Sequence, residues 1–290
     1  MTKSDEIVFK IGGLELGLSV KTGWKFTSLG RFPDFISKNS PQSVYQVTST
    51  PAPGLPPGVL IFDSLQSWRL YKNGDRSILW VGSRDDIPRI VGDFSPDFHS
   101  GQISVAKSNT EKGKYTFPLG YPMGELLMIN LLGSGYGIML HSCAVIDGDN
   151  GFVFAGMSSA GKTTTARLWN QTTGVQILND DHTILRKVND QFHVYGTPWH
   201  GEGGYALAAD APIKTIFIIE HAPTNQAIRL SPAQAAAGLL ARSFVKLWDT
   251  SAMAFTLQFL DVLCQTIPCY SLGFVPDQSV VEYVRCLSSS

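Results

Sequence analysis

Short runs of alternating apolar and polar residues dominate the chain from residue 1 to about residue 115, a pattern that predicts strands and turns. The runs Ile7–Ile11 and Leu14–Val20 flank the pair Gly12-Gly13, which favours a tight hairpin turn. The proline-rich stretch Pro51–Gly58 is incompatible with a helix or a central strand, so it predicts a loop. Further short strands are expected at Val59–Asp63, Trp68–Lys72, Ser77–Gly82 and Gln102–Ala106. The first part of the chain therefore predicts a small β or α+β subdomain.

The pattern changes after the polar linker Lys107–Lys114, where longer apolar segments of helical and strand period alternate. Helices are expected at Pro122–Leu132, Thr163–Asn170, Ser231–Trp248, Ala252–Gln265 and Gln278–Leu287. Strands are expected at Ile138–Ile146, Gly151–Ala155, Val175–Leu178, Pro212–Glu220 and Cys269–Phe274. Alternating strands and helices are typical of an α/β domain. We therefore predict a β-rich subdomain at residues 1–115 and an α/β domain at residues 116–290.

The composition narrows the class of protein. Hydrophobic residues make up 43% of the 290 residues, enough for a buried core, whereas the formal net charge is only −1. A chain without excess positive charge lacks the general attraction that basic proteins have for nucleic acids and anionic membranes. The polar start and the absence of an apolar stretch of about 18 residues predict neither a signal peptide nor a membrane helix. We expect a soluble cytoplasmic protein without a nucleic-acid or membrane partner, and leave homo-oligomer formation open.

The four cysteines lie at positions 143, 264, 269 and 286, and no two of them form a CxxC pair. In a chain of this size they predict reduced and mostly buried thiols rather than a disulfide framework. Cys143 and His141 are two apart on an expected strand and share a face, which would suit a catalytic pair. Nothing else in the sequence indicates acyl transfer.

The segment Gly156–Thr163 reads Gly-Met-Ser-Ser-Ala-Gly-Lys-Thr and matches the phosphate-binding loop pattern G-x-x-x-x-G-K-[ST] at every fixed position. An apolar strand precedes it and a helical segment follows, so backbone N–H groups and a helix N-terminus can converge on phosphates. Lys162 would bring a positive charge to the β- and γ-phosphates, and the Thr163 hydroxyl would ligate magnesium. The residues expected to bind the nucleotide are Gly156, Ser158, Ser159, Ala160, Gly161, Lys162, Thr163 and Thr164. The chain is thus predicted to bind ATP with Mg²⁺.

Two carboxylates, Asp180 and Asp181, follow the expected strand Val175–Leu178 and come 18 residues after Lys162. That spacing leaves room for one short helix and one strand, so both should lie where the strand ends, the edge at which ligands bind in α/β sheets. Successive strand residues point to opposite faces, so the two are expected to have different tasks unless the chain bends. One would face magnesium, directly or through water, and the other would accept a hydroxyl proton or orient the acceptor. A solvated Asp-Asp turn is the alternative.

Three segments together resemble the superfamily of HPr kinase/phosphorylase and phosphoenolpyruvate carboxykinase, namely Met139–Ala144, Gly156–Thr163 and Leu178–His182. HPr kinases carry a His-Gly strand before the loop and an Ala-Asp-Asp strand after it. ATP-dependent carboxykinases carry Met-His-Cys-Ser and Gly-Asp-Asp-Glu segments. The resemblance covers roughly residues 120 to 205. It implies the two-sheet α/β P-loop nucleotide domain of this superfamily, preceded here by the smaller β-rich subdomain.

The resemblance also implies roles for single residues. Asp180 takes the position of the HPr-kinase general base, and Asp181 takes that of the metal-associated aspartate of the carboxykinases. His141 matches a histidine near the transferred phosphate or the metal. We therefore expect Asp180, Lys162 and His141 to be catalytic, and Thr163 and Asp181 to hold the metal.

A closer similarity is to HPr-kinase-like proteins encoded with ribosomal peptide-modifying clusters, and it is carried by Tyr195–Glu202 and Phe217–His221. The chain lacks the Glu-x-Arg-Gly-Leu-Gly segment of HPr kinases, which argues against phosphorylase activity and against HPr as the substrate. It also lacks the arginine-rich substrate pocket of a carboxykinase, which argues against oxaloacetate decarboxylation. Glu202 is expected to join the magnesium shell in place of the missing glutamate, with a solvated loop as the alternative.

The sequence leaves two alternatives open for His200 and Arg242. His200 could contact the γ-phosphate, or it could lie in a solvated loop. Arg242, on the helix expected after Ser231, could stabilise phosphate charge, although a single arginine on a helix is more often at the surface. His182 and His221 are expected to be structural.

The leading hypothesis is an ATP- and magnesium-dependent kinase that phosphorylates a Ser or Thr hydroxyl of a peptide or small protein, because positioning and charge neutralisation suffice for phosphoryl transfer. A small-molecule kinase with the same site is the first alternative, and it would turn over without any peptide. A nucleotide-binding regulatory or assembly protein with little turnover is the second. The β-rich subdomain shows no catalytic constellation in its sequence and is predicted to hold the acceptor.

Overall fold

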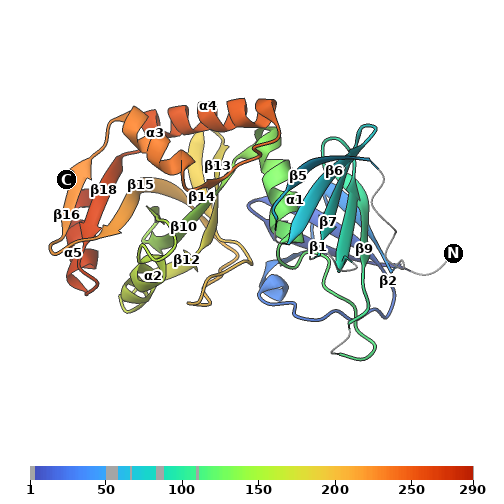
Figure 1. Ribbon diagram of the computed structural model, residues 1–290. Coiled ribbons are helices and arrows are strands. Elements are labelled where there is room, and N and C mark those ends of the chain that lie inside the picture. Colours follow the sequence, from blue (N-terminus) through green and yellow to red (C-terminus); the bar gives the residue numbers. More distant parts are fainter. Residues whose placement is uncertain (1–3, 50–57, 66, 83–87, 109–110, 290) are drawn as a thin grey trace. The chain divides into compact units, whose positions relative to one another are not determined.

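The computed structural model describes residues 4–49, 58–65, 67–82, 88–108 and 111–289 (Figure 1). The chain divides into two compact units, Met1–Leu131 and Leu132–Ser290. Within the described residues, each unit is built on a nine-stranded mixed sheet. The predicted loop Pro51–Gly58 lies outside the described residues except for Gly58.

The sheet of the first unit has the strand order β3-β1-β2-β4-β9-β8-β7-β6-β5, and only the pairs β2–β4 and β4–β9 are parallel. Its elements are β1 (Ser4–Ile11), β2 (Leu14–Lys21), the 3₁₀ helix η1 (Phe32–Phe35), β3 (Ile36–Ser37), β4 (Ser43–Thr48), β5 (Val59–Asp63), β6 (Trp68–Asn73), β7 (Arg76–Val81), β8 (Ile90–Phe94), β9 (Ser100–Val105) and α1 (Met123–Leu131). The predicted hairpin is confirmed, because Gly12 and Gly13 join β1 to β2 with φ angles of 57° and 72°. Such angles suit glycine and the tight turns of hairpins.

The second unit contains the alternating strands and helices that the sequence predicts. Its elements are η2 (Leu132–Tyr136), β10 (Ile138–Asp147), β11 (Asn150–Ala155), α2 (Lys162–Asn170), β12 (Val175–Asn179), β13 (His182–Val188), β14 (Gln191–Tyr195), β15 (Asp210–His221), β16 (Gln226–Arg229), α3 (Pro232–Leu240), β17 (Ser243–Phe244), α4 (Thr250–Thr266), β18 (Cys269–Phe274) and α5 (Ser279–Ser289). The α/β class of this part of the chain is therefore confirmed, with a mixed rather than an all-parallel sheet.

The pairing of strands brings four strand ends to one edge of the second sheet. β11 is parallel to β15, and β15 is parallel to β18. β11 and β12 both run antiparallel to β10, so β12 points the same way as β11. The segments that follow these strands therefore meet at the carboxyl edge of the sheet, where α/β proteins bind their ligands.

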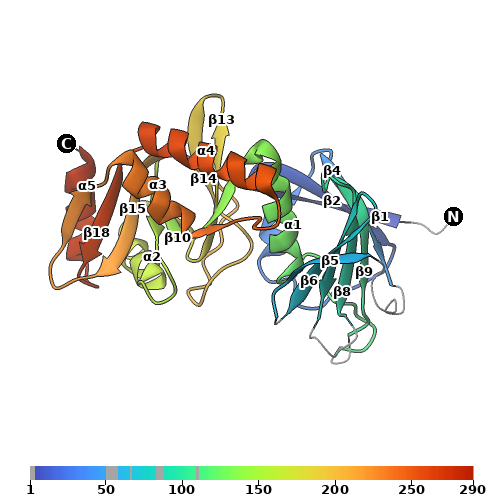
Figure 2. The same ribbon diagram turned by 45° about the horizontal axis from the view of Figure 1, so that its top comes forward.

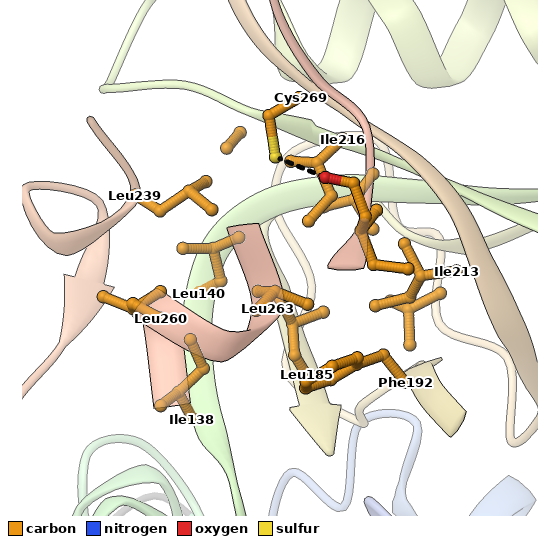
Figure 3. Close-up of a cluster of buried hydrophobic side chains, with 14 of the residues drawn as sticks. Ile138, Leu140, Leu185, Phe192, Ile213, Ile216, Leu239, Leu260, Leu263 and Cys269 are labelled. Carbon is orange, nitrogen blue, oxygen red and sulfur yellow. Dashed lines mark hydrogen bonds between the residues drawn. The ribbon is translucent and has the colours of Figure 1, made fainter. Parts of the chain in front are cut away.

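Helices cover both faces of this sheet (Figure 2). On one face, α3 and α4 bury Leu239, Leu260 and Leu263 against Leu140 of β10 and other strand side chains (Figure 3). On the other face, α2 and α5 bury a second cluster, which comprises Cys143, Val145, Phe152, Phe154, Ala166, Leu168, Trp169, Ile177, Phe217, Ile219, Leu272, Phe274, Val280, Val281 and Val284. The P-loop helix α2 is thus fixed from behind by an apolar core.

The thiols follow the expectation from the sequence. Cys143, Cys264 and Cys269 are buried and Cys286 is exposed, and all four are free cysteines. Burial raises the pKa of the Cys143 thiol above its usual value, which leaves it protonated and unreactive at neutral pH.

Several local expectations were wrong. The helix expected to reach about Trp248 ends at Leu240, because Ser243 and Phe244 pair with β10 as strand β17. The helix α1, expected in the second domain, lies in the first unit, where Met123 approaches Gly92 of β8. The sequence pattern did not predict the strands β3, β4, β8, β13, β14 and β16. In the described part of the chain, no helix is long and apolar enough to cross a membrane.

Candidate active site

The predicted phosphate-binding loop lies between β11 and α2, at the carboxyl edge of the second sheet. Gly161 stands at the N-terminal end of α2 with a φ of 101°, a value that L side chains rarely adopt. A Cβ on Gly161 would lie 2.6 Å from Cζ of Phe274, and one on Gly156 would lie 2.8 Å from Cβ of Ala160. Both glycines are therefore required by the path of the loop.

Lys162 lies inside this loop rather than at the surface, with 6% of its area exposed. Its ammonium donates hydrogen bonds to the carbonyls of Gly156 at 3.1 Å and Met157 at 3.0 Å. Burial lowers the pKa of Lys162, and the carboxylates of Asp181 and Asp180 oppose that shift. The arrangement holds a positive charge at the mouth of the loop, at a fixed place.

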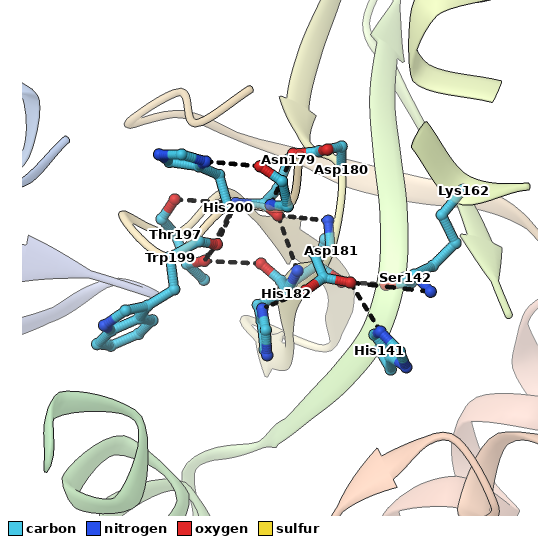
Figure 4. Close-up of polar contacts among 12 residues, drawn as sticks. His141, Ser142, Lys162, Asn179, Asp180, Asp181, His182, Thr197, Trp199 and His200 are labelled. Carbon is cyan, nitrogen blue, oxygen red and sulfur yellow. Dashed lines mark hydrogen bonds and ion pairs between the residues drawn. The ribbon is translucent and has the colours of Figure 1, made fainter. Parts of the chain in front are cut away.

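Asn179 shapes the bend that presents the two aspartates, and Figure 4 shows its contacts. Its Oδ1 accepts hydrogen bonds from the backbone N–H groups of Asp181 and His182, each at 2.7 Å. Its Nδ2 donates to the carbonyl oxygens of Thr197 at 3.0 Å and Trp199 at 2.9 Å. Asp180 and Asp181 therefore do not continue a strand. They lie in a bend between β12 and β13 that a buried amide holds in place.

The carboxylate of Asp180 is fully buried, with 0% exposure, and both of its oxygens are hydrogen-bonded. Oδ1 accepts from the N–H of Gly201 at 3.0 Å, and Oδ2 accepts from the N–H of Gly203 at 2.8 Å. The hydroxyl of Thr163 donates to the same Oδ2 at 3.3 Å. Asp180 thus joins the first turn of α2 to the glycine-rich loop that contains Glu202.

Asp181 is more accessible and has a different set of partners. Its Oδ1 lies 2.7 Å from Nε2 of His141 and 3.8 Å from Nζ of Lys162, and its Oδ2 lies 3.2 Å from Nδ1 of His182. Burial by itself raises the pKa of Asp181, but the hydrogen bonds and charges of the two histidines lower it far below the usual value. This carboxylate is therefore ionised throughout the neutral pH range.

A pocket of about 450 Å³ opens above these residues. Its lining comes from the phosphate-binding loop, the start of α2, β10, the bend and the glycine-rich loop, and comprises His141, Ser158, Ser159, Gly161, Lys162, Thr163, Thr164, Arg167, Asp181, Gly201, Glu202 and His221. The structure thus brings most of the predicted site residues together. Asp181 is one of the described residues that line the pocket. Asp180 is buried behind this lining.

The remaining candidates occupy different places. Glu202 is exposed at the rim of the pocket. His200 bonds to the carbonyl of Gly201 at 2.8 Å, outside the pocket lining. Arg242 donates to the carbonyl of Gly238 at 2.8 Å, and its own carbonyl accepts from the N–H of His141 at 2.8 Å. Arg242 therefore supports His141 through its backbone.

Two residues that line the pocket, Arg167 and His221, were not predicted to belong to the site. Arg167 lies four residues after Thr163 on α2, so helical periodicity places it on the same face. Helix side chains lean toward the N-terminus, which directs Arg167 to the pocket. His221 ends β15, and its ring packs against Phe274 at 5.3 Å. The helical period could have identified Arg167, whereas His221 depends on the pairing of β15 with β18.

No group of three or more His, Cys, Asp and Glu side chains in the described part of the chain is arranged to hold a metal ion. Magnesium seldom needs such a group, because it retains water and binds one or two carboxylates together with phosphate oxygens. Thr163, Asp181 and Glu202, the expected metal ligands, all line the pocket. The donor set thus fits a metal that arrives with a nucleotide rather than one held by the protein alone.

Comparison with models of known protein families found no match, and comparison with curated proteins found no similar sequence. Among solved structures, the Hpr(Ser) kinase/phosphatase from Coxiella burnetii matches 52% of this chain and 92% of its own length. The sequence identity is 12% and the TM-score is 0.29. At this distance the likeness supports no statement about activity.

Proposed function

We propose that this chain is an ATP- and magnesium-dependent kinase that transfers the γ-phosphoryl group to a Ser or Thr hydroxyl of a peptide or small protein. The observation that supports it best is that Lys162 and Thr163 line one pocket with the His141–Asp181 pair. A phosphate-binding loop needs the first two residues for any nucleotide. A carboxylate that is ionised, partly accessible and oriented by a histidine is what a hydroxyl acceptor needs in addition.

The residues present fit ATP and magnesium. Gly156 and Gly161 let the loop backbone pass close to Ala160 and Phe274, where a Cβ would overlap, and the N-terminus of α2 borders the pocket. The loop residues with Thr163 and Thr164 would hold the phosphates, and Thr163 with Glu202 would hold the metal. ATP would supply the phosphoryl group, and magnesium would neutralise charge on the phosphates.

The geometry favours roles for the two aspartates that are opposite to those that the family resemblance implies. Asp180 is buried and saturated with hydrogen bonds, including one from the Thr163 hydroxyl, so it suits a supporting role on the metal side. Asp181 is accessible from the pocket and suits the acceptor side. We therefore assign Asp180 to the positioning of Thr163 and of the Glu202 loop, and Asp181 to the acceptor.

In this scheme Asp181 accepts a hydrogen bond from the incoming hydroxyl and takes its proton as the oxygen attacks the γ-phosphorus of ATP and ADP leaves. The strongly lowered pKa of Asp181 makes it a weak base, so its main contribution is to orient the hydroxyl before proton loss. His141 and His182 hold the carboxylate in place. Lys162 stabilises the charge of the transferred group from the loop side.

The acceptor must reach a carboxylate of which only 26% is exposed, in a pocket that Glu202 and the phosphate-binding loop also line. A hydroxyl at the end of a short side chain can reach such a point while the rest of the molecule stays outside. Ser and Thr on a flexible peptide meet this condition, which supports a peptide over a rigid metabolite as the acceptor.

The test is phosphoryl transfer from labelled ATP to a library of Ser- and Thr-containing peptides and to a panel of hydroxyl metabolites. Asp181→Asn should lower transfer about 100- to 10,000-fold and leave ATP affinity within about threefold. Asp210→Asn is the matched control, because it alters another His–Asp pair of the second unit, His193–Asp210 at 2.8 Å, outside the pocket.

Three results would decide against the proposal. Transfer by Asp181→Asn at the rate of the unmodified chain would remove Asp181 from the chemistry. Label in metabolites alone would favour the small-molecule kinase. Tight ATP binding with neither transfer to an acceptor nor loss of ATP on incubation would favour a regulatory nucleotide-binding protein.

A further inference from the structure

A second cavity, of about 760 Å³, lies within the first unit and plays no part in the proposed reaction. Strand ends and loops form its wall, and its described lining comprises Thr27, Ser28, Val81, Pro88, Arg89, Ile90, Ala106, Lys107, Ser108, Thr116, Phe117, Gly120 and Tyr121. Its volume falls within the range of about 300 to 1,000 Å³ that is typical of small-molecule sites. We call it the cationic cavity, after Arg89 and Lys107.

Charge in the described lining of the cationic cavity has one sign. Arg89 and Lys107 are its ionisable cations, and no Asp or Glu is among the described lining residues. Neither cation takes part in an ion pair with another residue that the structure describes. Four other described arginines have such partners, among them Arg76 with Asp93 at 2.6 Å and Arg285 with Asp147 at 2.7 Å. Among the described residues, Arg89 and Lys107 thus give the cavity its positive charge without an acidic partner.

Backbone hydrogen bonds hold the segments that carry the two cations side by side. The N–H of Arg89 donates to the carbonyl of Val81 at 2.8 Å, and the N–H of Ala106 donates to the carbonyl of Arg89 at 3.0 Å. These bonds extend the pairing of β7, β8 and β9 past the strand ends, and Lys107 continues into a bridge with Tyr115. The cations are thus carried by adjacent extended segments rather than by independent loops.

The rest of the lining combines hydroxyl groups with an apolar floor. Thr27, Ser28 and Thr116 contribute hydroxyls, and Ile90 and Phe117 contribute buried apolar surface. Ser28 has a φ of 47°, in the left-handed region that side chains other than glycine seldom occupy. Such strain persists where the surrounding structure enforces it, and it is frequent at ligand sites. This is an observation on the backbone, independent of the charges.

We propose that the cationic cavity binds a ligand with a carboxylate or phosphate group on an apolar body. Arg89 and Lys107 would pair with the anionic group, since guanidinium and ammonium groups form strong charge-assisted hydrogen bonds with both. The hydroxyls would accept or donate the remaining hydrogen bonds. Ile90 and Phe117 would contact the apolar body. The proposal does not depend on the kinase activity.

The experiment measures binding of hexanoate, hexyl phosphate and hexanol to the full chain by isothermal titration calorimetry. The three probes share one apolar body, and the first two differ in the anionic group, which separates a carboxylate from a phosphate ligand. Lys162→Ala is included throughout, because the phosphate-binding loop could also take up hexyl phosphate. At least one anion should bind with a stoichiometry of one in Lys162→Ala, and about 10-fold or more tightly than hexanol.

Substitutions then locate the site. The double variant Arg89→Gln with Lys107→Gln should weaken anion binding about 10-fold or more, and Arg89→Lys with Lys107→Arg should retain most of it. Lys10→Gln with Lys38→Gln removes the same charge from exposed positions of the same unit and should leave the affinity unchanged. The charge-retaining variant also shows that a loss of binding does not arise from a loss of folding.

The proposal is overturned if neither anion binds in Lys162→Ala, or if hexanol binds as tightly as the anions. It is equally overturned if Lys10→Gln with Lys38→Gln weakens binding as much as the double variant in the cavity, because the attraction would then be a general effect of charge.

Discussion

Nε2 of His141 lies 2.7 Å from Oδ1 of Asp181, although the two residues are 40 positions apart in the chain. His141 belongs to β10 and Asp181 to the bend after β12, and β10 pairs with β12 and with β13 on either side of that bend. The histidine can therefore hold the carboxylate only when these strands are in register. The contact between His141 and Asp181 therefore forms only when this edge of the sheet is folded.

His141→Ala tests what this pair does for the chemistry. Removing one of the groups that lower the pKa of Asp181 should raise that pKa toward the usual range. We expect transfer at pH 7 to fall about 10- to 100-fold, and the acid side of the pH–rate profile to move to higher pH, because protonated Asp181 cannot accept a proton. Rates measured from pH 4 to 9 check this. An unchanged profile would mean that His141 acts on something other than Asp181.

Asn179 should be among the residues most sensitive to substitution. Asn179→Ala removes the hydrogen bonds that the buried amide makes with the N–H groups of Asp181 and His182 and with the carbonyl of Thr197. We expect the free energy of unfolding to drop by about 2 to 4 kcal/mol, since several buried polar groups lose their hydrogen bonds. Urea unfolding measures this drop. Asn225→Ala, which removes hydrogen bonds to Ser279 and Val275 in a more exposed setting, should cost clearly less.

Two glycine substitutions separate backbone strain from steric overlap. Gly148 has a φ of 61° and free space where a Cβ would lie, whereas a Cβ on Gly161 would overlap the Phe274 ring. Gly148→Ala should lower stability by about 1 to 2 kcal/mol without affecting ATP. Gly161→Ala should lower it further and abolish binding of a fluorescent ATP analogue. Adding Phe274→Leu to Gly161→Ala should recover part of the stability, and a lack of any recovery would contradict the overlap.

Asp249 should make α4 sensitive to acid. Its Oδ1 accepts the N–H of Ala252 at 3.0 Å and its Oδ2 pairs with Lys246 at 2.8 Å. Burial by itself raises the pKa of Asp249. These interactions lower the pKa by more than burial raises it, so the net shift is downward. A lowered pKa means that the stabilisation is complete above the unfolded value of about 3.9 and is lost as the pH falls through the folded value.

Asp249→Ala should therefore cost about 1 kcal/mol of unfolding free energy at pH 7, the usual effect of removing a helix N-cap. The difference from the unmodified chain should shrink as the pH is lowered below about 4. Denaturant unfolding at several pH values measures it. Asp261→Ala, on the exposed side of the same helix, is the control and should show no such dependence. A difference that stays constant down to pH 2 would exclude the carboxylate as its source.

Local features of the site were accessible from the sequence. The loop Gly156–Thr163 and its flanking strand and helix could be predicted because each signal lies within about twenty neighbouring residues. The position of Asp180 and Asp181 at the end of β12 followed from the distance to Lys162. Strands such as β13 and β14 were missed, because they are stabilised by pairing with β10 and β15 rather than by a strong pattern of their own.

The different surroundings of the two aspartates could not be foreseen. Asp180 is buried because Gly201 and Gly203 fold back onto it, and the sequence contains no local signal for a contact across more than twenty residues. The role of Asn179 is likewise tertiary, since it depends on the carbonyls of Thr197 and Trp199. Side chains with neighbours close in sequence were therefore predictable, and those defined by distant backbone were not.

The unequal burial of the cysteines makes the chain suited to labelling at one position. Cys143, Cys264 and Cys269 are enclosed by the two apolar clusters, whereas Cys286 is exposed on α5. An alkylating reagent at neutral pH should thus modify the native chain once and the denatured chain four times, which turns mass spectrometry into a count of folded molecules. A fluorophore on Cys286 would sit on the helix that packs behind the phosphate-binding loop, and it could report ligand uptake without a change to any residue of the pocket.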